Sequence, residues 1–477
     1  MPHKDLLSGL YKLIDRYLDE NNDPDTPVVD FQTPSALRTL VDVPLAEYGV
    51  SDAELLELIS QYLKYSMRTG HPQFFNQLYQ GFNLPGFAGE IVSAAANTSM
   101  YTYEVAPVAT LIEQELIVRM SSMAGFTANE GLFLPGGSNA NMTAMMIARN
   151  QVDSGIRENG IPPGLTAFVS DQAHYSFLKA ANVLGLGLNA VIKIQSDEDG
   201  RMIPTALETA IVRAEEEGRR PFFVAATAGT TVLGAIDPIQ SLSEIAQKHD
   251  LWLHVDGALG ASLLLSGSYR HLLDGVENAD SLAWNPHKTM GVPLICSALL
   301  CRKRGVLASS ASCDHSDYLF HDEESPDLGK KSLQCGRKVD ALKLWLSWKY
   351  FGDRGYEKRI NRMMALAQYA SSVIRSADDM ELKSDVYSFN VCFQFTGGTG
   401  DVRSRNAVNR QIRDRLLYDG SSAVNYASLN GETVLRIAFI NPDISESDVD
   451  TFFSNVRLSG HQLTNETVER TPGREHF

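Results

Sequence analysis

The chain has 477 residues, of which 44% are hydrophobic and 21% are charged, values that are ordinary for a folded globular protein. This length predicts two or three domains rather than one core. The net charge of −16 argues against nucleic acid and anionic membrane surfaces as partners. No run approaches the roughly 18 to 20 apolar residues of a membrane span, and the first twenty residues lack the apolar core of a signal peptide.

The five cysteines are odd in number and form no CxxC pair. This usage predicts neither a disulfide framework nor a zinc site, so we expect no metal. A reducing compartment suits such a chain best. We therefore expect a cytoplasmic protein.

The chain begins with a predicted amphipathic helix over residues 5–20, because its leucines recur at helical spacing. This stripe needs a partner surface. The following stretch, "NNDPDTPVVDFQTPSA", is rich in turn-forming residues and indicates a linker. We expect residues 1–65 to form an N-terminal helical segment.

From about residue 90, helical stretches alternate with short apolar runs that are typical of strands. These runs are 166–170, 190–194, 222–227, 251–255, 281–284 and 297–301. The alternation predicts an α/β domain with a largely parallel sheet, which we place at residues 66–350. Such a sheet binds its ligand at the carboxyl ends of its strands.

A long amphipathic stretch, residues 339–376, leads out of this domain. Beyond it, "NVCFQF" and "TVLRIAFI" have the composition of strands, and the tail after about residue 460 is polar. We expect a small C-terminal α+β domain over residues 351–477.

Polar residues follow several of the predicted strands. His174, Thr231, Asp256 and the pair His287-Lys288 each come just after an apolar run, and Gly136-Gly137-Ser138 precedes a helical run. Each alone has a common structural explanation. An aspartate after a strand is usually a helix cap, a single histidine is usually structural, and Gly-Gly-Ser is usually a turn with an N-cap.

Together these residues match the chemistry of one cofactor. A helix N-terminus binds phosphate, a carboxylate keeps a ring nitrogen protonated, an imidazole stacks on a ring, and a lysine forms a Schiff base. This combination favours pyridoxal 5'-phosphate. A competing signal, "GLGLNA", fits a dinucleotide-binding pattern, but it precedes an apolar strand instead of following one, which disfavours that interpretation.

Ordered motifs extend this match over residues 60–445. They include "HPQFFNQLYQGFNLPGFAGE", "LPGGSNANM", "DQAHYS", "ATAGTTVLGAIDPI", "LWLHVDGA", "WNPHKTMGVPL", "DYLF" and "LRIAFINP". The chain resembles the pyridoxal phosphate-dependent decarboxylases of acidic amino acids, which include glutamate decarboxylase and relatives acting on cysteine sulfinate and aspartate. The resemblance implies an aspartate-aminotransferase-like large domain with a mostly parallel seven-stranded sheet.

The same resemblance implies roles for individual residues. The catalytic residues would be Lys288, which holds the cofactor as a Schiff base, Asp256, which pairs with the ring nitrogen, His174, which stacks on the ring, and Tyr318, which lies on a mobile loop. Either Tyr318 or His174 would return a proton to Cα. The implied cofactor-binding residues are Gly137, Ser138, Asn139, His174, Thr231, Asp256, Ala258, Asn285, His287 and Lys288. Asp237 would lie behind Thr231.

The implied substrate-binding residues are Gln77, Tyr79, Ser99, Tyr101 and Arg436, with Arg436 on the α-carboxylate. Glutamate enzymes of the family typically read "NQLS" and "NTNMFTYE", whereas cysteine sulfinate and aspartate relatives resemble "NQLF" and "NTSQYTYE". This chain has "NQLY" and "NTSMYTYE". An aromatic residue at Tyr79 shrinks the pocket, so we expect aspartate, cysteine sulfinate or cysteate as the substrate and β-alanine, hypotaurine or taurine as the product. The alternative is glutamate, giving 4-aminobutyrate, because one methylene discriminates weakly.

Three residues depart from the family pattern. Gly257 and Leu259 stand in "HVDGALG" where the family has "HVDAAWG", and Asn139 stands where isoleucine is common. We expect the first two to loosen or reshape the wall behind the cofactor. Rival interpretations are an aminotransferase or aldolase-like enzyme on the same fold, and a non-catalytic protein that binds pyridoxal phosphate. The resemblance also implies a homodimer with sites shared between chains.

Overall fold

The computed structural model describes residues 3–153, 155–312, 319–320 and 325–469. The chain forms two compact units. The small unit comprises Met1–Gly81, Ala365–Asp385 and Asn390–Phe477, and the large unit comprises Phe82–Met364 and Val386–Phe389. The boundaries predicted from the sequence, after residues 65 and 350, stay a prediction.

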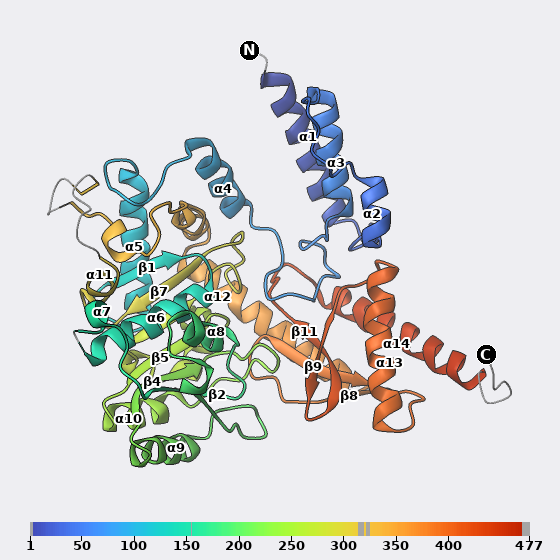
Figure 1. Cartoon of the computed structure of the whole chain (residues 1–477). Helices are drawn as coiled ribbons and strands as arrows, with labels where there is room; N and C mark the ends of the chain where they lie inside the picture. Colours follow the sequence, from blue (N-terminus) through green and yellow to red (C-terminus); the bar gives the residue numbers. More distant parts are fainter. Residues whose placement is uncertain (1–2, 154, 313–318, 321–324, 470–477) are drawn as a thin grey trace. The chain divides into compact units, whose positions relative to one another are not determined.

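The large unit is built on the seven-stranded, mostly parallel sheet that the resemblance implied (Figure 1). Its strands are β1 (Glu130–Leu134), β2 (Leu165–Ser170), β3 (Val191–Ile194), β4 (Arg220–Thr227), β5 (Trp252–Gly257), β6 (Ser281–Trp284) and β7 (Ser297–Cys301). Their order is β1-β7-β6-β5-β4-β2-β3, and only β7 runs antiparallel to its neighbours. The central strand β5 is buried along its whole length, as expected of a sheet covered on both faces.

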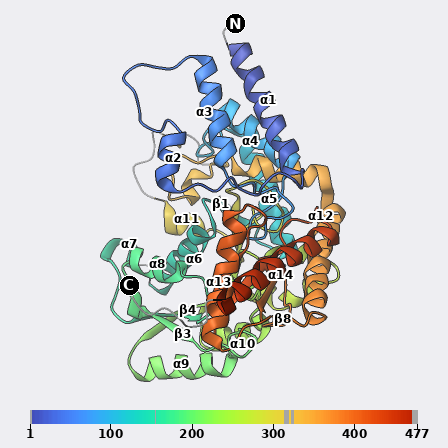
Figure 2. The same ribbon diagram turned by 90° about the vertical axis from the view of Figure 1, so that its right-hand side faces the viewer.

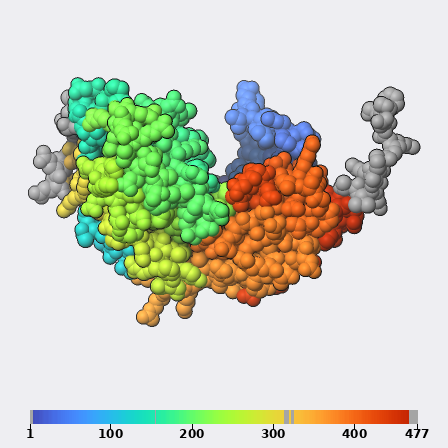
Figure 3. Space-filling model, turned by 90° about the horizontal axis from the view of Figure 1, so that it is seen from below, coloured from blue at the N-terminus to red at the C-terminus, as the bar shows by residue number. Residues whose placement is uncertain are grey.

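Helices connect and cover these strands. They are α4 (Leu84–Ala96), α5 (Pro107–Met123), α6 (Gly137–Val152), α7 (Ile156–Asn159), α8 (Ser176–Val183), α9 (Pro204–Glu216), α10 (Ile239–Lys248) and α11 (Val306–Ala311), with short 3-10 turns at η1 (Leu188–Ala190), η2 (Ala261–Leu265), η3 (Arg270–Leu273), η4 (Val276–Asn278) and η5 (Gly329–Lys331). Helix α6 packs across β4, β5, β6 and β7 through a face of small residues such as Ala140 and Ala144. Figure 3 shows the outer surface of this unit with the α9 and α10 region, coloured green to yellow-green, toward the viewer.

The long helix α12 (Asp340–Arg375) contributes residues to both units. Its backbone leaves the helical conformation at Gly352, where φ is 63° and ψ is 179°. A positive φ of this size suits glycine, which explains why the helix bends at this residue.

The small unit contains an antiparallel sheet in the order β10-β11-β9-β8. These strands are β8 (Met380–Leu382), β9 (Asn390–Phe395), β10 (Asn425–Leu429) and β11 (Glu432–Ala438), and the helices are α1 (His3–Asn21), α2 (Pro34–Leu40), α3 (Asp52–Tyr65), α13 (Val402–Tyr418) and α14 (Glu446–Glu469). Asn430 and Gly431, both with positive φ, form the two-residue turn of the β10–β11 hairpin. The predicted strands in "NVCFQF" and "TVLRIAFI" are confirmed as β9 and β11.

The predicted N-terminal helix is confirmed as α1, which lies beside α3 in both ribbon views (Figures 1 and 2). The segment interpreted as a linker is not a plain solvent-exposed linker. Val28 is fully buried against Phe74 and Ala423, and its N–H donates to Gly420 O at 2.8 Å. Among the described residues, no helix has the length and apolar character that a membrane crossing requires.

Candidate active site

The candidate site of the large unit lies at the carboxyl edge of its sheet, where the parallel strands β4, β5 and β6 end. The strand register pairs Asp256 with Thr227 on one side and with Ala283 on the other. Asn285, His287 and Lys288 follow directly after β6. The fold therefore brings the predicted residues of three strands to one edge.

Asp256 is the most strongly constrained of these side chains. It is 5% exposed, and each carboxylate oxygen accepts a hydrogen bond: Oδ1 from the backbone N–H of Ala258 at 3.1 Å, and Oδ2 from Asn141 Nδ2 at 2.8 Å. Two fixed donors set the plane of the carboxylate. Asn141 was missed by the sequence analysis. Its one signal was a polar residue on the otherwise small or apolar buried face of α6.

His174, after β2, interacts with both Asp256 and Lys288. Burial lowers the pKa of its imidazole, the Asp256 carboxylate raises it, and the Lys288 ammonium lowers it. The net direction is downward, so the ring is neutral near pH 7. Its Nδ1 accepts the backbone N–H of Ser176 at 3.3 Å, which leaves the ring proton on Nε2.

The start of α6 forms a small polar cradle beside Asn285. The first N–H groups of a helix, here those of Gly137 and Ser138, have no partner inside the helix. A Cβ added at Gly137 would lie 2.7 Å from Asn285 Nδ2, so the asparagine needs a glycine there. Asn285 Oδ1 is buried and has no hydrogen-bond partner among the residues that the structure describes.

His287 lies next to this cradle and is buried. Its Nδ1 donates to Cys296 O at 2.7 Å, and burial lowers the pKa of the imidazole to about 4. The apo form therefore holds His287 neutral. Asn139, in the first turn of α6, donates from Nδ2 to Pro135 O at 3.1 Å.

The loop after β4 contains Thr231, which is exposed, and the buried Asp237. Asp237 accepts the backbone N–H groups of Met202 and Thr227, both at 2.7 Å, and burial raises its pKa to about 6. Both of its oxygens are therefore used by the backbone. Asp237 holds the loop in place rather than facing a ring directly.

The wall behind Asp256 is tightly packed, contrary to the loosening that we expected at Gly257. A Cβ at Gly257 would lie 2.8 Å from both Ala261 Cβ and Leu282 Cδ1. Leu259 is 1% exposed, and Ala258 is half-buried. The glycine therefore leaves no hole, because its neighbours occupy the space.

Three of the predicted substrate-binding residues belong to the small unit. Arg436 on β11 is 5% exposed, and its Nη2 donates to Asn76 O. Gln77 Nε2 donates to Asn76 Oδ1 at 3.0 Å. Tyr79, two residues further along the chain, is half-buried. Burial lowers the pKa of Arg436, yet an arginine remains charged at neutral pH.

The other predicted substrate residues, Ser99 and Tyr101, belong to the large unit. Ser99 Oγ donates to Cys335 O at 3.3 Å and accepts the N–H of Arg337 at 3.2 Å. Tyr101 stacks on Phe320 with ring centroids 5.3 Å apart. Tyr318 lies outside the described residues.

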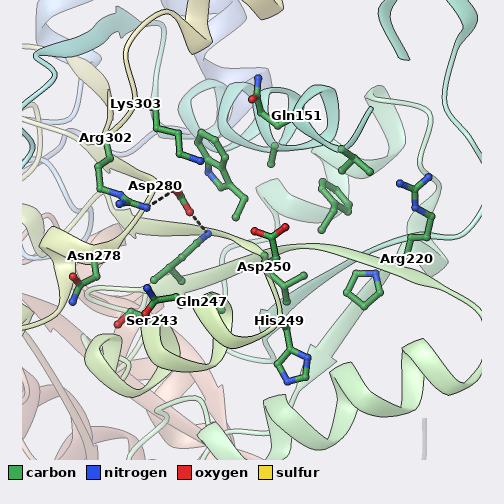
Figure 4. Close-up of a pocket in the computed structure, with 18 residues that line it drawn as sticks. Gln151, Arg220, Ser243, Gln247, His249, Asp250, Asn278, Asp280, Arg302 and Lys303 are labelled. Atoms are coloured by element: carbon green, nitrogen blue, oxygen red, sulfur yellow. Dashed lines mark hydrogen bonds and ion pairs between the residues drawn. The ribbon is translucent and has the colours of Figure 1, made fainter. Parts of the chain in front are cut away.

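A second polar cavity, of about 600 Å³, lies at the opposite, amino edge of the same sheet (Figure 4). Its walls carry Arg220, Asp250, Asp280, Arg302 and Lys303. Arg302 Nη2 lies 2.8 Å from Asp280 Oδ1, the contact drawn between them in Figure 4. None of the predicted site residues lines this cavity.

Comparison with known proteins identifies the family. Residues 34–396 match the pyridoxal-dependent decarboxylase conserved domain. The chain belongs to the pyridoxal-dependent decarboxylase family. Cysteine sulfinic acid decarboxylase of Mus musculus is 40% identical over 451 residues, which cover 91% of this chain and 92% of that protein. Acidic amino acid decarboxylase GADL1 of Mus musculus is 38% identical, covering 92% and 83%.

The fold agrees with this assignment. The crystal structure of mouse CSAD superposes with a TM-score of 0.93 at 38% identity, covering 96% of this chain and 98% of that one. This pyridoxal-dependent decarboxylase is therefore a carboxy-lyase that acts on an amino acid and uses pyridoxal phosphate. The residues present suit that group: the first N–H groups of α6, with Asn285 Nδ2 beside Gly137, suit a phosphate, and the fixed carboxylate of Asp256 suits a ring nitrogen.

Proposed function

We propose that the chain removes the α-carboxyl group, as CO2, from a short acidic amino acid: aspartate, cysteine sulfinate or cysteate. The product would be β-alanine, hypotaurine or taurine. When bound, pyridoxal phosphate supplies an electron sink for the pair left by the broken Cα–carboxyl bond. The observation that carries the proposal is the buried carboxylate of Asp256, held by two N–H donors in a site that also contains Lys288 and His174.

The large unit supplies the residues that would hold the cofactor. Lys288 would bind it covalently through Nζ, and Asp256 would face the ring nitrogen. The ring would lie between His174 and Ala258, with Thr231 at its polar edge. The phosphate would be bound by the residues of the α6 cradle and the turn after β6, which are Gly137, Ser138, Asn139, Asn285 and His287. The N–H groups of Gly137 and Ser138 at the start of α6, which have no partner inside the helix, support this placement.

The proton that replaces CO2 at Cα needs an acidic donor. His174 is a poor one, because its lowered pKa leaves it neutral, and a neutral imidazole gives up its proton far less readily than a phenol of pKa about 10. We therefore assign the proton to Tyr318 and a stacking role to His174.

The substrate end would be formed by Arg436, Gln77, Tyr79, Ser99 and Tyr101. Arg436 would bind the α-carboxylate, because a buried, always charged guanidinium forms bidentate pairs with carboxylates. Gln77 would donate to the distal acid group. Tyr79 supports a short substrate, because its ring fills space that a serine would leave open. The names of the two relatives, cysteine sulfinic acid and acidic amino acid decarboxylase, also support an acidic substrate.

The first test is amine and CO2 release by the cofactor-loaded enzyme. Aspartate, cysteine sulfinate, cysteate and glutamate are offered separately, and Lys288→Ala is the control. We expect one of the first three to give the highest kcat/KM. Glutamate as the best substrate would overturn the short-acid proposal and favour 4-aminobutyrate synthesis.

A matched pair of variants then tests Tyr79. Tyr79→Ser opens the space and should raise the glutamate-to-aspartate ratio of kcat/KM roughly 10-fold or more, the range that one methylene is worth. Tyr79→Phe removes only the hydroxyl and should leave the ratio nearly unchanged. Equal ratios in the two variants would remove Tyr79 from substrate selection.

We also propose that the enzyme is a homodimer. The support is an apolar surface over α4, α5 and the segment between them, where four residues are at least half exposed: Val92, Val105, Val108 and Leu111. Several large apolar side chains exposed within one stretch of twenty residues favour a protein interface there. Val108→Asp should shift the mass in solution from dimer to monomer, whereas Val212→Asp, on exposed α9, should not. Light scattering coupled to gel filtration distinguishes the two.

The cytoplasm remains our proposed compartment. Its support is the absence of disulfides at the four described cysteines, Cys296, Cys301, Cys335 and Cys392, all of which are free thiols. Fractionation of the native source tests it.

A further inference from the structure

A line of buried polar side chains runs through the large unit from Asp256 back toward the amino edge of the sheet. Its members are Asn141 on α6, His254 on β5, Ser281 on β6 and Trp252 on β5. Their exposed fractions are 1%, 0%, 0% and 6%. None of the four was assigned a role from the sequence.

Successive members are joined by hydrogen bonds of normal length. Trp252 Nε1 lies 2.9 Å from Ser281 Oγ, and Ser281 Oγ lies 2.8 Å from His254 Nδ1. His254 Nε2 lies 3.0 Å from Asn141 Oδ1, and Asn141 Nδ2 lies 2.8 Å from Asp256 Oδ2. Asn141 Nδ2 also lies 2.9 Å from Ser176 Oγ.

The direction of the hydrogen bonds in this line is set at Asp256. A carboxylate only accepts, so the Asn141 amide presents its NH₂ group to Asp256 and its Oδ1 to His254. The neutral His254 therefore donates from Nε2 to Asn141 Oδ1, and its Nδ1 accepts the hydroxyl proton of Ser281. Ser281 Oγ in turn accepts the Trp252 N–H.

Asp256 and the neutral His254 together fix the orientation of the Asn141 amide. A flipped amide would place Oδ1 against the Asp256 carboxylate and NH₂ against the N–H of His254. Both contacts would be repulsive, and the buried donors would lose their acceptors. Because His254 is fully buried and stays neutral, this arrangement does not change near physiological pH.

Packing between α6 and the sheet does not require these hydrogen-bonded polar side chains. Helix α6 faces the sheet with small or apolar side chains such as Ala140, Ala144 and Met145, and apolar residues are the less costly way to fill a core. A fully satisfied polar line is instead a device that fixes geometry. Its last member donates to the one carboxylate that the proposed chemistry uses.

We propose that Asn141 and His254 are positioning residues that hold the Asp256 carboxylate in the orientation that receives the cofactor's ring nitrogen. The proposal rests on the function proposed for Asp256. Asn141 acts on the carboxylate directly, and His254 acts through Asn141. Neither residue touches the reacting atoms.

The test compares two probes on the apo-protein: pyridoxal 5'-phosphate and its deaza analogue, in which carbon replaces the ring nitrogen. The affinity for each is measured by fluorescence titration. The unaltered protein should prefer pyridoxal phosphate. Asn141→Leu should weaken pyridoxal phosphate binding roughly 10-fold, the scale of one lost charge-assisted hydrogen bond, and leave the analogue nearly unaffected.

Two further variants separate positioning from packing. Asn150→Leu, on the same helix and also buried, should leave the preference for pyridoxal phosphate intact. His254→Phe should reduce the preference, and His254→Gln should restore it, because glutamine keeps one donor and one acceptor. If Asn141→Leu does not fold, the His254 pair decides the question by the same measurement.

Each outcome has one meaning. Equal weakening of both probes in Asn141→Leu shows a packing role and overturns the proposal. Full preference retained in Asn141→Leu or in His254→Phe overturns it as well. If the unaltered protein does not distinguish the probes, the role of Asp256 fails first, and the substrate assay shows whether decarboxylation survives without it.

Discussion

The two edges of the large unit's sheet carry similar charged residues, but the polar groups at the two edges differ in their pairing and burial. The carboxyl edge has Asp256, Lys288 and His174, and the amino edge has Asp280, Lys303 and Arg302 beside a cavity of about 600 Å³. At the amino edge the charges pair with each other near water, as Arg302 and Asp280 do with 43% and 11% of their side chains exposed. At the carboxyl edge, Thr227 Oγ1 and Asn285 Oδ1 are buried with no partner among the described residues.

This difference teaches which observation indicates a site. An exposed ion pair costs little to form and contributes little, so a charged cavity is a common surface feature. A buried polar atom without a partner costs about 1–3 kcal/mol, but among the described residues His249 Nε2, which lines the amino-edge cavity, is also such an atom. Such atoms therefore indicate a site only where the neighbouring residues have the chemistry to bind one ligand. A charged cavity alone would have favoured the wrong edge.

The largest effect is expected when one lysine at each edge is replaced by alanine in separate variants. Lys288→Ala should lower turnover by about 10³-fold or more, because the covalent attachment of the cofactor is lost. The cofactor's protein-bound absorbance band should disappear with it. Lys303→Ala, at the amino edge, should keep both. Turnover that persists in Lys288→Ala would refute the site assignment.

A smaller effect is expected from the aspartates. Asp256→Asn removes the charge that would face the ring nitrogen, and kcat should fall by roughly 10²-fold, the scale of one lost preorganised electrostatic group. Asp250→Asn is the matched control at the amino edge, where the residue has a φ of 51° that asparagine tolerates. Similar kcat values for the two variants would contradict the comparison.

The buried histidines predict a pH dependence of stability. His254 and His287 have pKa values lowered to about 4 by burial, so between pH 6.5 and 4 the unfolded chain binds protons that the folded chain does not. The free energy of unfolding of the apo-protein should therefore fall as the pH falls through this window, by roughly 3 kcal/mol per histidine at most.

Asp237 opposes this trend, because its pKa is raised to about 6. As the pH falls, the folded state therefore binds this proton at a higher pH than the unfolded chain does, which stabilises the folded state. One carboxyl group against two imidazoles still leaves a net loss toward acid pH. Urea unfolding at several pH values measures it. His254→Gln should reduce the slope; a slope equal to that of the unaltered protein would show that His254 is not its source.

The smallest effects are expected at the amino edge. Asp280→Ala leaves the buried N–H of Leu253, which donates to Asp280 Oδ2 at 3.0 Å, without an acceptor, and should cost about 1–3 kcal/mol of stability. Arg302→Ala removes a half-exposed ion pair and should cost about 0–1 kcal/mol. Thermal unfolding ranks the two, and neither should change kcat. A large loss of turnover in either would give the amino edge a functional role.

Much of this arrangement could be predicted from local sequence. Strands β2 to β7, β9 and β11 are continuous apolar runs, and Asp256 and Lys288 follow such runs directly. Strand β1 was missed because it starts with Glu130, a buried carboxylate whose partner, Lys331, lies 2.8 Å away but about 200 residues on in the chain. Its second residue, Gly131, also disfavours a strand prediction.

Asn141 and Val28 were missed for the same physical reason. The role of Asn141 depends on contacts with β5 and β6, and the burial of Val28 depends on Phe74 and Ala423. Neither set of contacts leaves a local pattern in the sequence. Periodicity predicts which face of an element is buried, but it does not say which polar group that face will meet.

The close packing at Gly257 has a consequence for comparing sequences in this family. Alanine is usual at this position, yet here an added methyl group would lie 2.8 Å from Ala261 Cβ and 3.0 Å from Ala283 O. The backbone oxygen belongs to β6 and cannot turn aside as a side chain can. An alanine at position 257 is therefore acceptable only after its surroundings have changed, so the order in which substitutions occur matters. A single exchange of glycine and alanine at position 257 therefore needs compensating substitutions among the residues around it.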